Sequence, residues 1–69
     1  MASTTVAGLT ELAGRLEQQL SNQASYRSIV TRILLRTGVN IREPKSDQNG
    51  DPALVAKVTG VLGEMGYRF

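Results

Sequence analysis

The apolar residues within residues 26–39 are spaced for an α-helix, and this stretch constrains the fold more than any other. Intervals of three and one place its largest apolar side chains on a single helical face, namely Tyr26, Ile29, Val30, Ile33 and Leu34. At about 100° per residue, Arg32 and Arg36 point roughly the opposite way. We therefore predict an amphipathic helix over residues 23–37, with an apolar side and an arginine side.

Two further stripes with helical spacing flank this segment. The first predicts a helix over about residues 5–20 and consists of Val6, Leu9, Leu12, Leu16 and Leu20. The second predicts a helix over residues 52–65 and consists of Leu54, Val55, Val58, Val61, Leu62 and Met65. Asp51 and Pro52 suit the first positions of this last helix, and Gly66 suits its end.

The connections between the helices follow from the turn-forming residues. Residues 21–25 hold three good N-caps, and the apolar stripe changes phase there, so a break is predicted. One continuous helix through this point is the alternative, because no proline interrupts it. Gly38 suits the left-handed position that ends a helix. Residues 39–50 are expected to form a long polar loop, mobile in its second half.

The predicted fold is therefore an all-α, three-helix domain of residues 6–69 that follows a flexible tail at residues 1–5. Ser3, Thr4 or Thr5 is expected to be the N-cap of the first helix. The core of the domain is expected to comprise the large apolar residues of the three stripes: Leu9, Leu12, Leu16, Leu20, Ile29, Val30, Ile33, Leu34, Leu54, Val58, Leu62 and Met65.

The composition argues against an enzyme. The 69 residues contain neither cysteine nor histidine, which excludes disulfides, thiolate nucleophiles, conventional zinc sites and a histidine base. The acidic stretch that begins at Asp47 lacks the glycine and glutamate positions of a calcium loop. No glycine-rich phosphate loop and no suitably placed carboxylate pair are present. We therefore expect no catalytic residue, no metal and no cofactor.

The positive charge is concentrated around the central helix. Residues 26–45 hold five basic side chains and one acid, whereas the whole chain has a net charge of +2. The commonest explanation is that arginine solvates one helix face and pairs with neighbouring glutamates. The functional alternative is a small DNA- or RNA-binding protein of helix-turn-helix type that uses Arg27, Arg32 and Arg36. The low charge and the lack of an aromatic platform weigh against that alternative.

Four residues outside the stripes suggest contact with another protein. Leu35 lies close to the arginine side, so either the loop after Gly38 covers it or it belongs to an interface. Gly60 and Gly63 lie on the side of the last helix opposite its apolar stripe. There they indicate either a close helix–helix contact or a solvent-exposed face with no role in binding. The terminal Phe69 either tucks under that helix or anchors a partner.

We accordingly predict a non-enzymatic protein–protein interaction module, an adaptor, regulator or subunit that binds a larger protein or a second copy of itself. The candidate partner-binding residues are Arg27, Arg32, Leu35, Arg36, Gly60, Gly63 and Phe69. No signal peptide is apparent, and the longest aliphatic run, residues 33–35, is too short to span a membrane. A cytoplasmic location is the expectation.

Overall fold

The computed structural model describes residues 7–69, and all of their regular secondary structure is helical. The helices are α1 (Leu9–Gln19), α2 (Gln23–Thr37), α3 (Ser46–Asn49) and α4 (Pro52–Glu64). The all-α prediction is therefore confirmed for the described part of the chain. The predicted number of helices was wrong there, because the segment expected to be a loop contains the single turn α3.

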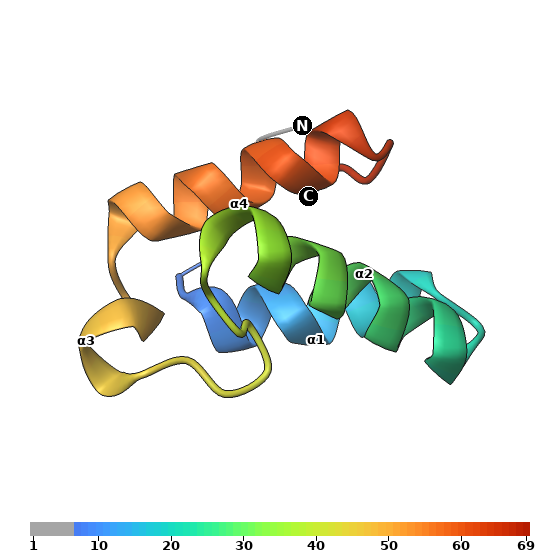
Figure 1. Ribbon diagram of the computed structural model, residues 1–69, viewed down its shortest axis with the longest axis horizontal. Coiled ribbons are helices and arrows are strands. Elements are labelled where there is room, and N and C mark those ends of the chain that lie inside the picture. The colour runs from blue at the N-terminus through green and yellow to red at the C-terminus, as the bar shows by residue number, and fades with distance from the viewer. Residues whose placement is uncertain (1–6) are drawn as a thin grey trace.

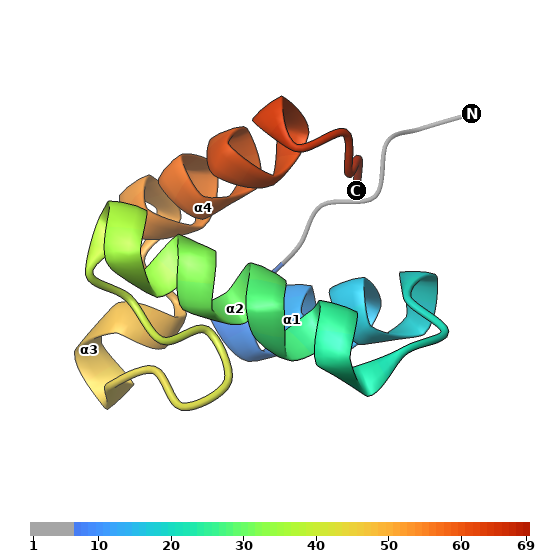
Figure 2. The same cartoon turned by 45° about the vertical axis from the view of Figure 1, so that its right-hand side comes forward.

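The helices α1, α2 and α4 pack against one another around a shared core. α2 runs in the direction opposite to α1 and α4, and α3 lies at the end of the molecule where α1 and α4 begin (Figures 1 and 2). α3 also contacts α1. One long side of α2 consequently faces its two neighbours, and the other side faces solvent.

The core joins all three long helices to the connection that follows α2. Its buried residues are Leu9, Leu12, Ala13, Leu16, Tyr26, Ile29, Val30, Ile33, Val39, Ile41, Val58, Val61 and Leu62. Leu20, Leu54 and Met65 were expected there and are half-buried against it. The prediction that Leu34 belongs to the core was wrong, because this residue is 41% exposed.

The break between α1 and α2 is confirmed, and an asparagine starts the second helix. Leu20 adopts an extended conformation, which ends α1. The backbone N–H groups of Ala24 and Ser25 donate to Asn22 Oδ1 at 2.7 and 3.2 Å. This N-cap satisfies two donors that have no partner within the helix.

The remaining helix ends follow the predicted local signals. Gly38 adopts a left-handed conformation with φ 76° and ends α2, while Gly66 does so with φ 93° after α4. Asp51 Oδ1 accepts from Ala53 N at 2.9 Å, and Pro52 is the first residue of α4. Tyr67 N donates to Leu62 O at 2.9 Å, which closes the turn around Gly66.

The start of α1 differs from the prediction. The expected start near residue 5 and the caps at Ser3, Thr4 or Thr5 lie outside the described residues, but Ala7 and Gly8 precede the helix. Gly8 is extended and has no side chain with which to cap α1.

The missing cap comes from α3. Asn49 Oδ1 accepts from both the backbone N–H and the hydroxyl of Thr10, at 3.0 and 3.1 Å. A residue distant in sequence thus caps α1 and holds α3 against it.

Replacing Asn49 by Ala is expected to lower the free energy of unfolding by about 1 kcal/mol, the usual value of an N-cap. Asn49→Asp should retain most of that stability, because a carboxylate accepts the same hydrogen bonds and suits a helix N-terminus. Urea unfolding followed by circular dichroism measures both. Equal losses for the two variants would contradict a capping role for this side chain.

The connection between α2 and α4 contains a helical turn and buried residues that were not predicted. Val39 and Ile41 are buried in the core, so the first part of the connection packs against the helices, whereas Arg42 and Glu43 after it are exposed. Gln48 Oε1 accepts from Lys45 N at 3.1 Å, a contact that closes the single turn of α3. The prediction of a long polar loop missed the turn α3, because residues 42–50 are mostly polar, and it did not include Val39 or Ile41 in the core.

Candidate interaction surface on α2

The solvent side of α2 presents an exposed surface that we call the outer face of α2. It is defined by six exposed residues: Ala24, Arg27, Ser28, Thr31, Arg32 and Leu35. The opposite side of the helix is fixed in the core by Tyr26, Ile29, Val30 and Ile33. Because a helix is rigid over these few turns, the core contacts also fix the direction in which the outer face points.

Leu35 is the most exposed large apolar residue of the described chain. Leu35 is 80% exposed, and within residues 7–69 the one other exposed large apolar residue is its neighbour Leu34. Val39 and Ile41 pack in the core, so the connection after Gly38 does not cover Leu35. Of the two alternatives that the sequence left open, cover by that loop is therefore wrong.

The arginines of α2 differ in their surroundings. Arg36 Nη2 donates to Glu64 Oε1 at 2.8 Å, which links the last turns of α2 and α4. Arg27 and Arg32 are exposed and make no ion pair with any residue in the described range 7–69. Since α2 contains no Asp or Glu, its outer face carries uncompensated positive charge.

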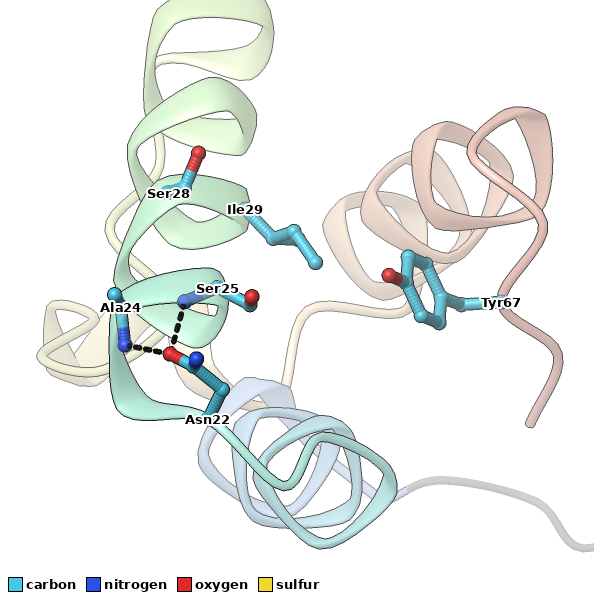
Figure 3. Close-up of a pocket in the computed structure, with 6 residues that line it drawn as sticks. All are labelled: Asn22, Ala24, Ser25, Ser28, Ile29 and Tyr67. Carbon is cyan, nitrogen blue, oxygen red and sulfur yellow. Dashed lines mark hydrogen bonds between the residues drawn. The ribbon is translucent and has the colours of Figure 1, made fainter.

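Two shallow recesses border the first half of this face. One is lined by Ala24, Arg27, Ser28 and Thr31. The other lies between the start of α2 and the segment after α4, and its walls are Asn22, Ala24, Ser25, Ser28, Ile29 and Tyr67. Figure 3 shows Ile29 pointing toward Tyr67 across this second recess. The short side chains of Ala24 and Ser28 leave both recesses open.

A third recess lies on another side of the molecule, next to Tyr26. It is lined by Thr10, Ala13, Gly14, Glu17, Tyr26 and Arg42. The guanidinium carbon of Arg42 lies 5.7 Å from the centre of the Tyr26 ring, a cation–π distance. Burial raises the pKa of Tyr26, Glu17 adds to the rise and Arg42 opposes it. The phenol therefore stays protonated at neutral pH, as a structural residue would.

The structure separates the seven candidate partner-binding residues into three places. Arg27, Arg32 and Leu35 share the outer face of α2, with Arg36 at its border beside Glu64. The two glycines are exposed on α4, and Phe69 is half-buried against the core. The sequence did not single out Ala24, Ser28 and Thr31. Small side chains indicate a contact surface only when they are known to be exposed on the same face as Leu35.

Alanine at Gly60 and at Gly63 is expected to stabilise the protein by about 0.5–1 kcal/mol at each position, because glycine disfavours helix interiors. A Cβ added at either glycine meets no atom of the described residues 7–69 within 4 Å. Chemical denaturation measures the gain, and sedimentation measures the mass. A dimer that becomes monomeric in the double variant would instead assign these glycines to a contact between two copies.

Comparison with known proteins identified no relative. No family model matches the chain, and neither a curated protein nor a solved structure matches it significantly. None of the helices in residues 7–69 is long and apolar enough to cross a membrane. Within the same residues, His, Cys, Asp and Glu form no group of three or more that could hold a metal ion.

Proposed function

We propose that this protein is a non-enzymatic protein–protein interaction module, an adaptor, regulator or subunit that binds its partner through the outer face of α2. The observation that carries the proposal is Leu35, which is 80% exposed beside Arg32, an arginine that forms no ion pair within residues 7–69. Complete burial of a leucine side chain is worth about 1.5–3 kcal/mol. A protein surface supplies that burial, whereas a phosphate backbone does not.

Single exposed leucines are common on protein surfaces, so Leu35 alone would not define a site. The proposal gains support from what surrounds it. Leu34 extends the apolar surface to one side, and the recess at Ala24 and Thr31 continues along the same helix. Apolar contact bordered by arginine is the composition typical of interface centres.

The lining of the two recesses on α2 supports a binding role over a catalytic one for this face. The two recesses on α2 are lined by hydroxyl, amide and apolar groups with a single arginine. This set offers no acid–base pair of the kind that proton transfer requires.

A small DNA- or RNA-binding protein is the second candidate. It is favoured by the exposed guanidinium groups of Arg27 and Arg32, which form no ion pair within residues 7–69. Such binding would weaken steeply as salt is raised, because each neutralised phosphate releases counterions. Titration of a short duplex and a short RNA at two salt concentrations tests this candidate.

Site-specific photo-cross-linking tests the proposed function. A photoreactive benzoylphenylalanine replaces Leu35 in one variant and Lys57, exposed on α4, in a matched control. In extracts of the source cells, we expect a discrete adduct at position 35 that protease removes and nuclease does not. No protein adduct at 35, or the same adducts at both positions, would refute the proposal. Adducts that nuclease removes would favour the second candidate.

A further inference from the structure

The outer face of α2 contains a regular seam along the helix. Its central residues, at intervals of four, three and four, are Ala24, Ser28, Thr31 and Leu35, all of them exposed. Residues at these intervals form one stripe on a helix surface. Three short side chains followed by one leucine give the stripe a low, hollowed part and a raised end, in line with the recess lined by Ala24, Ser28 and Thr31.

This shape suits a second helix. The seam covers 11 residue steps, so it is about 17 Å long at the rise of an α-helix. Small side chains allow another helix to approach closely, at the lower end of the usual interaxial distance of about 8–10 Å. An amphipathic helix bound in a groove uses the same intervals on its own side.

The charges beside the seam specify what that helix carries. At about 100° per residue, Arg27 lies on one side of the seam and Arg32 on the other. Both are exposed, and neither forms an ion pair within residues 7–69. With no carboxylate on α2 itself, the seam has positive charge along both margins.

We infer that the seam binds an amphipathic helix of a partner protein that carries carboxylates on both sides of its apolar stripe. This inference rests on the proposed function and names the partner's chemistry. A second copy of α2 does not fit, because its arginines would oppose Arg27 and Arg32. The exposed side of α4 in a second copy offers Lys57 together with Glu64, whose carboxylate Arg36 already binds.

Two synthetic amphipathic peptides of about five helical turns test the inference. Both have the same alanine and leucine stripe, and the flanking positions are glutamate in one and lysine in the other. Each is titrated into the isotopically labelled full chain, and backbone amide shifts are recorded. We expect the glutamate peptide to shift amides of residues 24–35 and to bind at least about tenfold more tightly than the lysine peptide.

Charge reversal in the protein supplies the matched control. The double variant Arg27→Glu, Arg32→Glu should prefer the lysine peptide, whereas Lys57→Glu on α4 should leave the preference unchanged. The inference fails if both peptides bind equally, if neither binds, if the shifts centre on α4, or if a DNA duplex displaces the glutamate peptide. Should neither peptide bind while position 35 still cross-links to a protein, the proposed function stands and only the helical acidic partner is refuted.

Discussion

Replacing Ile41 by Ala is expected to lower the free energy of unfolding by about 2–5 kcal/mol, the usual cost of truncating a fully buried isoleucine. Ile41 is 0% exposed although it lies in the connection between α2 and α3. A chain of 69 residues at ordinary stability has only about 3–10 kcal/mol in total. The variant should therefore unfold far more readily than the parent, in both heat and urea, as circular dichroism would record.

Two matched substitutions separate the effect of burial from a general sensitivity of the protein to the loss of an apolar side chain. Ile41→Val removes one methylene and should cost about 0.5–1.5 kcal/mol. Leu35→Ala removes a similar side chain from an exposed position and should change stability by no more than about 0.5 kcal/mol. If Ile41→Ala and Leu35→Ala unfolded at the same urea concentration, the burial of Ile41 in the core would be contradicted.

The sequence predicted the long helices because their signals are local. The spacing of apolar residues identified α2 with the same bounds that the structure has, residues 23–37. Asn22 was one of three candidate caps, and Gly38 and Asp51 were assigned correctly at helix ends. Each of these signals acts within one or two helical turns, so the chain need not fold before it can be recognised.

The features that the sequence did not predict depend on contacts between distant segments. The start of α1 is set by Asn49, which lies 39 residues beyond Thr10. The burial of Ile41 and the exposure of Leu34 depend on which surfaces the neighbouring segments cover. An apolar stripe on a helix is wider than the surface that its neighbours cover, so periodicity alone cannot separate Leu34 from the core.

The candidate site was predicted in part for the same reason. Leu35 was singled out because it lies outside the apolar stripe. Whether a loop covers it depends on tertiary contacts, which the spacing of apolar residues does not predict. Arg36 was grouped with Arg27 and Arg32 on sequence grounds, and the structure separates it through its contact with Glu64. The seam itself became visible only once Ala24, Ser28 and Thr31 were known to be exposed.

Replacing Gly8 by Ala is expected to destabilise the protein by about 1–3 kcal/mol, the range for forcing extra volume into a packed site. Gly8 is buried where α3 approaches α1, and a Cβ there would lie 2.8 Å from the backbone oxygen of Asn49. That oxygen cannot move as a flexible side chain would. Relief requires α3 to shift, which weakens the two hydrogen bonds from Thr10 to Asn49.

Gly14→Ala is the control, because the same change in the same region should have the opposite sign. Gly14 is exposed inside α1, and among the residues that the structure describes an added Cβ meets nothing within 4 Å. Alanine there should stabilise the helix by about 0.5–1 kcal/mol. Urea unfolding of the two variants in parallel measures the difference. If Gly8→Ala also gained stability, α3 would not be held against α1 at this point, and the cap from Asn49 would be wrong as well.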